Sequence, residues 1–319
     1  MFLPTEPLTW VTVWRAWHFD TAAALCAIAL GTGYGWALTR ARRRHADISG
    51  VWASCFFTGV GCWVLACMSV VGLYAHVLFW MRALQVVLLL LVVPFFLALG
   101  RPVTVVRGAL QPDGLDRFDR GLSSAPARVL THPLTTSLAM LVTPWLLYLT
   151  PWYTASLTHD LLGAMTRTAL ALIGFAYFYA RLQVDPVPRK YPQLISLVLS
   201  VAETIGDGVL GLVLWQGPLV ASSYYLALHR SWGPDMRTDQ TLGAGILWIL
   251  GDVLGLPFLL LLMRALSADD KAQAARIDAE LDRADQNSLD PGNTMAMDPA
   301  TPTLWWENDP QLRERFGRR

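Results

Sequence analysis

The sequence predicts an all-α fold, a polytopic membrane protein built as a seven-transmembrane-helix bundle. The 319-residue chain is 54% hydrophobic, only 15% charged and contains fourteen Trp, a balance typical of membrane proteins rather than soluble domains. Its apolar stretches hold few charges and approach the roughly 20 residues that a helix needs to cross a bilayer. Seven such spans are predicted, at residues 19–39, 50–73, 77–99, 134–150, 161–179, 194–215 and 241–266.

The fourth predicted span is short, and the seventh is interrupted at Pro257. Pro94 and Pro144 lie inside two other spans. Because proline removes a backbone hydrogen bond, we expect the helices to kink at these positions. Residues 102–133, between the third and fourth spans, are basic and contain several Pro and Gly, so they predict a loop with one short amphipathic helix. The membrane domain as a whole is predicted to cover residues 19–266.

Both ends of the chain are predicted to lie outside that domain. Residues 1–18 predict an extracytoplasmic or interfacial segment; they lack the basic start and cleavage site of a secretory signal, so we expect no cleavage. Trp10, Trp14 and Trp17 recur there at helical spacing, which suits either a short helix at the membrane interface or ordinary packing. Residues 267–319 predict a cytoplasmic tail, helical to Asp285 and then disordered.

Lys and Arg side chains set the predicted orientation, because basic loops are retained on the cytoplasmic side. The loops after the first, third and fifth spans carry twelve, namely Arg40, Arg42, Arg43, Arg44, Arg101, Arg107, Arg117, Arg120, Arg128, Arg181, Arg189 and Lys190. The opposite side carries only Arg15, Arg230 and Arg237. We therefore expect a multi-pass protein of the plasma (inner) membrane, with its N-terminus outside and its C-terminus in the cytoplasm.

Five ionisable side chains lie inside the apolar spans: Arg82, Arg167, Glu203, Asp207 and Asp252. A charge in hydrocarbon is costly, so each is expected to face a partner or a wet cavity inside the bundle. Glu203 and Asp207 are four residues apart and therefore share one face of a helix. Two cations and three anions at similar depth predict one buried ion-pair network.

All four cysteines lie within the first two spans, where a free Cys is commonly a small buried hydrophobe. A second interpretation stays open, because soft sulfur ligands suit Cu(I). The sulfur-bearing side chains toward the outer half of the membrane are Cys62, Cys67, Met68 and Met81. No closely spaced pair of Cys or His residues supports this interpretation.

Missing motifs exclude several chemistries. The chain has no G-x-x-x-x-G-K-[ST] phosphate loop, no H-E-x-x-H metal motif and no G-x-S-x-G nucleophile turn. A retinal protein would need a lysine inside its last span, but the two lysines of the chain, Lys190 and Lys271, lie outside all seven. We therefore expect neither enzyme activity nor a nucleic-acid partner.

A series of polar motifs follows the predicted spans in order. It comprises Trp17-His18-Phe19-Asp20, Leu99-Gly100-Arg101-Pro102-Val103, Thr131-His132-Pro133, Val184-Asp185-Pro186-Val187-Pro188-Arg189, Trp232-Gly233-Pro234-Asp235 and Asp239-Gln240. Each motif alone is weak, but their order and spacing resemble the CtaG family of cytochrome c oxidase assembly factors, in particular its actinobacterial members. The resemblance covers most of the chain. It implies a seven-span membrane protein associated with copper delivery to the oxidase.

The resemblance also implies metal-ligand histidines on the third, fifth and sixth spans, and this chain lacks them. The family pattern F-x-x-H-M-x-Q-H falls on residues 79–86, where Arg82 and Val86 replace the two histidines. On the fifth span the family's H-x-H falls on Arg167 and Ala169, and on the sixth the histidine falls on Asp207. Because Arg stays protonated and has no lone pair to donate, the resemblance implies a degraded histidine copper site.

We therefore expect a membrane-embedded, non-enzymatic assembly factor for cytochrome c oxidase, acting in copper-site maturation or structural support. Its expected partners are oxidase subunits or other assembly factors, together with the lipid membrane. No cofactor is certain, and transient binding of Cu(I) by the sulfur residues stays open. Two alternatives also stay open. In the first, the two arginines form an anion- or carboxylate-binding pocket open to the outer surface. In the second, the protein is a small-solute or metal-ion permease, and the same charges line its outer cavity.

Overall fold

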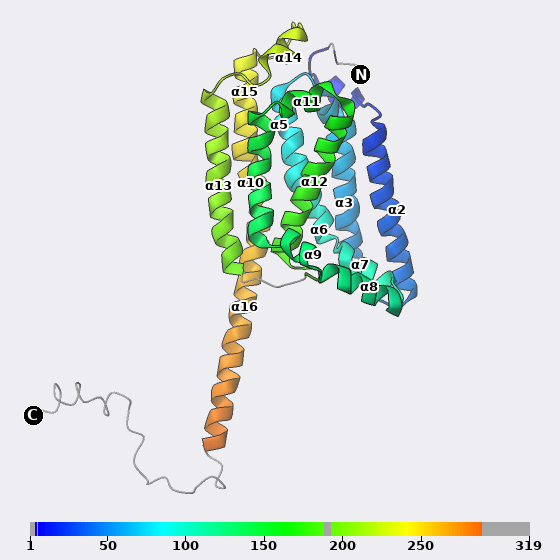
Figure 1. Cartoon of the computed structure of the whole chain (residues 1–319), viewed down its shortest axis with the longest axis vertical. Helices are drawn as coiled ribbons and strands as arrows, with labels where there is room; N and C mark the ends of the chain where they lie inside the picture. The colour runs from blue at the N-terminus through cyan, green and yellow to red at the C-terminus, as the bar shows by residue number, and fades with distance from the viewer. Residues whose placement is uncertain (1–3, 5, 188–192, 289–319) are drawn as a thin grey trace, which may run out of the picture. The chain divides into compact units, whose positions relative to one another are not determined.

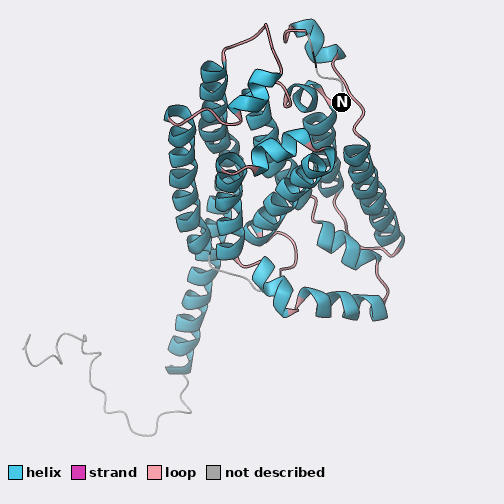
Figure 2. Ribbon diagram, turned by 45° about the horizontal axis from the view of Figure 1, so that its top comes forward, coloured by secondary structure: helices cyan, strands magenta, loops and turns pink. Residues whose placement is uncertain are grey.

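The computed structural model describes residues 4, 6–187 and 193–288 of the chain. Over these residues all regular structure is helical, as Figures 1 and 2 show. The chain divides into two compact units, Met1–Leu266 and Ser267–Arg319. The all-α prediction is confirmed, and the candidate membrane helices lie in the first unit.

Six helical stretches of the described residues are long and apolar enough to cross a membrane: Thr21–Arg43, Gly50–Tyr74, Phe79–Ala109, Asp160–Leu182, Leu197–Gln216 and Met236–Leu261. They correspond to six of the seven predicted spans. The predicted fourth span is α10 (Pro133–Leu149), which has only 17 residues. It meets α11 (Trp152–Thr158) at an angle of 73°, and the pair is either one broken span, which would be the seventh, or a re-entrant loop.

The long helices of the first unit stand side by side, and short elements close its two ends (Figure 1). The side-by-side helices include α2 (Thr21–Arg43), α3 (Gly50–Met68), α10, α12 (Asp160–Leu182) and α13 (Gln193–Gln216). The end that carries the N-terminal segment, α11 and α14 (Ser222–Ala227) is called the upper end, as it appears in Figure 1. The opposite, lower end carries α7 (Pro102–Ala109), α8 (Pro112–Leu122) and α9 (Ala125–Leu130).

The third span is continuous in direction but changes its helical form at Pro94. It runs through α5 (Phe79–Val87), the π-helical turn η1 (Leu88–Val92) and α6 (Val93–Leu99). Since Pro94 has no N–H to donate, the wider π turn before it absorbs the missing bond. Gly174 of α12 packs on this turn, because a Cβ at that position would lie 2.2 Å from the carbonyl oxygen of Leu90. Pro94 therefore follows a π turn, and the kink expected there stays a prediction.

The last span has a similar break. It runs through α15 (Met236–Gly245), the π-helical turn η2 (Ile246–Leu250) and the start of α16 (Gly251–Ser288). Pro257 lies inside α16, and Pro144 lies inside α10. The predicted tail helix is confirmed, since α16 extends to Ser288. The predicted disorder falls chiefly on residues from 289 onward, which lie outside the described part.

Residues 102–133 form three short helices, α7, α8 and α9, instead of the single helix predicted. Each begins with a proline at its first or second position, namely Pro102, Pro112 and Pro126. Proline suits the first turn of a helix, where an N–H would have no partner, and prevents the preceding helix from continuing. The recurrence of proline along this loop therefore divides it into three.

The predicted N-terminal helix forms as α1 (Trp10–Arg15), started by a capping box between Thr9 and Thr12. Trp10 and Trp14 are 86% and 80% exposed. Their side chains therefore do not pack in the core of this unit, which favours the interfacial interpretation.

Candidate functional site

The five intramembrane charges do not form the single network predicted, because the two arginines lie apart from the three carboxylates. Within the described residues only Arg167 and Glu203 of the five form ion pairs, and their partners are Asp20 and Arg181. Arg181 and Arg167 are 14 residues apart on α12, about 21 Å along a straight helix. Arg167 and Glu203 are therefore too far apart to pair.

A cavity of about 420 Å³ lies at the upper end, between elements that are distant in the sequence. We call it the upper pocket. Its lining includes His18 and Asp20 before α2, His76 in the turn before α5, Ser156 of α11 and Arg167 of α12. The break between α11 and α12 and the start of α2 therefore bring polar side chains together at this end.

Arg167 closes one side of the upper pocket through an ion pair. Its Nη2 lies 2.5 Å from Oδ2 of Asp20, and the two side chains are only 8% and 17% exposed. The other oxygen of Asp20 accepts a hydrogen bond from the N–H of Ala23 at 2.8 Å, which caps the start of α2. One carboxylate thus starts α2 and neutralises the cation of α12.

Arg82 is buried behind Ser156, with 1% of its surface exposed. Its Nη2 donates to Oγ of Ser156 at 3.0 Å, and its Nη1 donates to Oε1 of Gln85 at 2.7 Å. Both acceptors are neutral, and the Nε atom has no partner in the described structure. Gln85 is held in turn by a bond to the carbonyl of Ala66. Arg82 is therefore a buried cation without a carboxylate partner.

Two imidazoles complete the upper pocket. The Nδ1 atoms of His18 and His76 are both buried and have no hydrogen-bond partner in the described structure. Burial lowers the pKa of His18, and burial together with the charges of Arg82 and Arg167 lowers the pKa of His76 to about 3. Both rings are therefore neutral near neutral pH, and each keeps one unused nitrogen.

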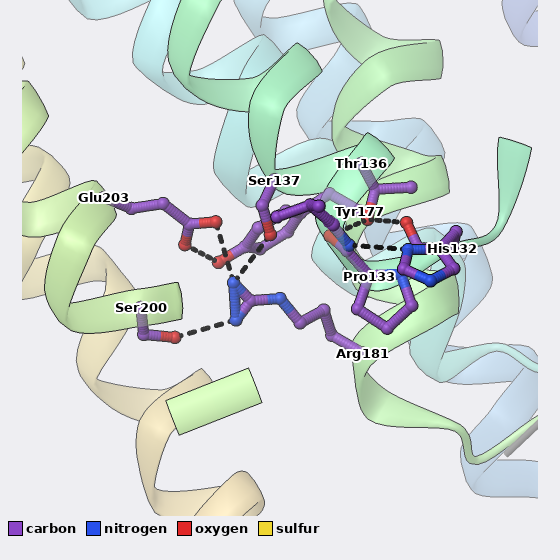
Figure 3. A network of polar contacts seen from close by, with 9 residues as sticks. His132, Pro133, Thr136, Ser137, Tyr177, Arg181, Ser200 and Glu203 are labelled. Atoms are coloured by element: carbon purple, nitrogen blue, oxygen red, sulfur yellow. Dashed lines mark hydrogen bonds and ion pairs between the residues drawn. The ribbon is translucent and has the colours of Figure 1, made fainter. Parts of the chain in front are cut away.

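A third buried arginine, Arg181, lies near the lower end and is 0% exposed; Figure 3 shows its polar contacts. Its Nη2 donates to Oε1 of Glu203 at 2.7 Å and to Oγ of Ser137 at 3.0 Å, while its Nη1 donates to Oγ of Ser200. Its guanidinium also lies 4.6 Å from the ring centre of Tyr177, whose hydroxyl donates to Glu203 at 2.6 Å. We call these five residues the lower cluster. The sequence predicts Arg181 to lie in the loop after the fifth span, and the structure corrects this, because α12 continues to Leu182.

The two remaining predicted charges, Asp207 and Asp252, form neither a hydrogen bond nor an ion pair through their side chains in the described structure. Both are half-buried. Asp207 lines a cavity of about 40 Å³ whose other walls are largely apolar, and it interacts electrostatically with Glu203 and Asp252. The structure thus brings the three carboxylates of the predicted set near one another but leaves out its two arginines.

The four candidate sulfur ligands divide between two apolar clusters. Cys62, Cys67 and Met68 pack in or against the main core, whereas Met81 packs with Val70, Tyr74 and Leu78. Over the described residues, no group of three or more His, Cys, Asp or Glu side chains is placed to hold a metal ion.

The acidic residues of the sequence motifs are helix caps. Asp185 accepts hydrogen bonds from the N–H groups of Val103 and Thr104 at the start of α7, and burial raises its pKa. Asp239 accepts from the N–H groups of Phe79 and Trp80 at the start of α5. These side chains satisfy amide groups that have no partner within their own helix. The acidic residues of the motif series therefore connect the starts of helices to segments that are distant in the sequence.

Comparison with known proteins is consistent with this geometry. Residues 32–269 match the family described as cytochrome c oxidase caa3 assembly factor (Caa3_CtaG). Curated relatives include an uncharacterized protein of Mycobacterium leprae, 24% identical over 285 residues, and one of Mycobacterium bovis, 26% identical over 302 residues.

These alignments cover 87% and 91% of this chain but only 43% and 45% of the two relatives. The chain thus spans less than half the length of the curated relatives it matches. No solved structure matches it. The family match extends over most of the first unit, and the chain belongs to the cytochrome c oxidase caa3 assembly factor (Caa3_CtaG) family.

Proposed function

We propose that this chain is a membrane-embedded, non-enzymatic assembly factor for cytochrome c oxidase that supports maturation without a histidine copper site of its own. Family membership supports the assembly role. The single observation that supports the second part is the buried state of Arg82 and Arg167, at positions where the family resemblance expects metal-ligand histidines.

The chemistry of these two arginines is unsuited to copper. A guanidinium has no free lone pair and stays charged, so it cannot ligate a metal and repels a cation nearby. The sulfur residues are a weaker alternative for transient Cu(I), because Met81 packs in a different cluster from Cys62 and Cys67. We therefore assign the chain a structural role toward oxidase subunits or other assembly factors in the same membrane.

The proposed orientation puts the upper end outside the plasma membrane and the lower end in the cytoplasm. Three of the basic residues behind this orientation, Arg40, Arg44 and Arg107, make contacts between neighbouring elements at the lower end. Arg40 and Arg44 donate to the carbonyls of Ala109 and Leu110, and Arg107 pairs with Asp119. This arrangement keeps the basic charge at one end of the bundle, as the positive-inside rule requires.

A permease is less well supported than an assembly factor. Transport would need a polar path joining the upper pocket to the lower cluster, which lie about 21 Å apart along α12. Fully buried apolar side chains occupy the core of the bundle, including Leu89, Leu147 and Leu170. Leu170 lies one turn below Arg167 on α12, so the helix itself becomes apolar just below the pocket.

The assembly role is tested by deleting the gene and measuring cytochrome c oxidase activity and the amount of assembled complex in membranes. We expect both to fall and to be restored by the wild-type chain and equally by a variant in which Cys62→Ser and Cys67→Ser are combined. Unchanged oxidase in the deletion strain would contradict the assembly role.

If the double Ser variant reaches wild-type abundance in the membrane but does not restore oxidase activity, the result would instead show that sulfur ligands are needed. A direct check is the copper content of the purified chain after loading with Cu(I). We expect less than stoichiometric copper and no difference between the wild type and the double variant.

A further inference from the structure

We propose that the upper pocket is a binding site for an oxyanion, a carboxylate or phosphate group. The inference goes beyond the assembly role and does not depend on it. It rests on three features of the pocket: its charge, its unused hydrogen-bond donors and its size.

The charge of the pocket is unbalanced. Arg167 is neutralised by Asp20, but Arg82 directly behind Ser156 has only the neutral acceptors Gln85 and Ser156. Asp160 also lines the pocket, yet its side chain is exposed and belongs to the rim. A buried cation without a counter-charge is strongly unfavourable. An anion in the pocket would supply the missing negative charge.

The pocket also has donors with nothing to bind. Nη1 of Arg167 forms no hydrogen bond in the described structure, and it lies 3.6 Å from where a Cβ on Gly163 would be. Nδ1 of His18 is also buried without a partner in the described structure. A neutral imidazole can carry its proton on Nδ1 and donate it. Guanidinium and N–H donors around one cavity are the groups that recognise carboxylate and phosphate.

The size and rim of the pocket favour a group larger than a simple ion. Its volume is about 420 Å³, within the range of small-molecule sites. Phe19 and Leu161 on its lining are 75% and 73% exposed, so the rim carries these apolar side chains beside Asp160. Arg167 and, behind Ser156, Arg82 are buried. The oxyanion can therefore come from a free anion or from the headgroup of an acidic lipid whose chains lie beside this rim.

The test uses the purified full chain in an uncharged detergent and follows thermal unfolding. One arm adds sodium phosphate against sodium chloride at the same ionic strength. The other adds phosphatidylglycerol against phosphatidylcholine in mixed micelles. A ligand that binds only the folded state raises the Tm in a saturable manner. A response to phosphate identifies a free-anion site, and a response to phosphatidylglycerol alone identifies a lipid headgroup site; either supports the proposal.

The variants locate the effect. Arg82→Gln should weaken the apparent affinity at least tenfold while leaving the Tm without anion unchanged or higher. The matched control, Arg181→Gln in the lower cluster, should lower the Tm without anion but keep the response. If Arg82→Gln fails to fold, the double variant Asp20→Asn with Arg167→Gln removes both charges of the ion pair. It should also lose the Tm response to the anion.

Three results would overturn the proposal. The first is no saturable response to either probe in the wild type. The second is loss of the response in Arg181→Gln as well as in Arg82→Gln, which would show a general effect on the fold. The third is saturable stabilisation by Cu(I) without stabilisation by either anion probe, where His18→Gln and His76→Gln abolish the effect of Cu(I). That result would make the two imidazoles a metal site.

Discussion

A fully buried arginine lies directly behind the upper pocket and another lies in the lower cluster, and the two differ in how their charge is compensated. Arg181 donates to one carboxylate and two hydroxyls and lies on an aromatic ring. Arg82 donates to one amide and one hydroxyl and has no carboxylate partner among the residues that the structure describes. A compensated buried charge holds helices together, whereas an uncompensated one indicates a missing partner. The comparison therefore separates a structural cluster from a binding site.

The largest expected effect is at the lower cluster. Glu203→Gln would leave Arg181 buried without a counter-charge, and because Arg cannot lose its proton, we expect a loss of about 3–5 kcal/mol in the free energy of unfolding. Unfolding in detergent measures it. The control is the double variant Glu203→Leu with Arg181→Met, which removes both charges and should cost clearly less. An equal loss in the two variants would contradict the ion-pair explanation.

The second prediction concerns Gly174, which lies on α12 between Arg167 and Arg181. A Cβ there would approach the carbonyl oxygen of Leu90 to 2.2 Å and Cγ of Pro94 to 2.5 Å. Gly174→Ala should therefore shift α12 and cost about 1–3 kcal/mol, disturbing both regions together. Gly33→Ala is a matched control, since nothing lies within 4 Å of its Cβ position. A Gly174→Ala variant with an unchanged free energy of unfolding would show that α12 is not held against the π turn.

The third prediction is a pH dependence that comes from His76 in the upper pocket. Burial and the neighbouring Arg82, Arg167 and His18 lower the pKa of His76 from 6.5 to about 3. The unfolded chain therefore binds a proton below about pH 6.5 that the folded chain does not. This contribution to stability is fully present above pH 6.5 and is lost as the pH falls toward 3.

His76→Gln should flatten that part of the stability profile, measured as the Tm between pH 7 and pH 4. The exposed residue His159 provides the control, since His159→Gln should leave the slope as in the wild type. If the slopes of the wild type and His76→Gln coincide, the imidazole is not buried beside the two arginines.

Hydropathy along the sequence was sufficient to predict the helical class and six of the spans, because these properties depend on local composition. It also anticipated the weak fourth span, which has 17 residues in α10. Partners across the bundle were not predictable in this way. Asp239 caps α5 from 160 residues away, and a pairing at that separation leaves no local pattern.

Arg181 shows how a local criterion fails at the end of a span. The apolar stretch of the sequence ends at Tyr179, which predicts that Arg181 lies in the loop. The helix continues to Leu182, which carries Arg181 into the bundle beside Glu203. Arg167 and Asp20 were both noticed in the sequence, one as an intramembrane charge and one as part of a motif. Only the fold brings them within 2.5 Å.

The most direct test of the difference between the two regions compares Arg82→Gln with Arg181→Gln in the same detergent without added anion. We predict that Arg181→Gln lowers the free energy of unfolding by about 3 kcal/mol, because it leaves Glu203 without its cation. We predict that Arg82→Gln changes it by less than about 1 kcal/mol, since loss of two neutral hydrogen bonds is offset by removal of an uncompensated charge. Equal losses in the two variants would contradict the account.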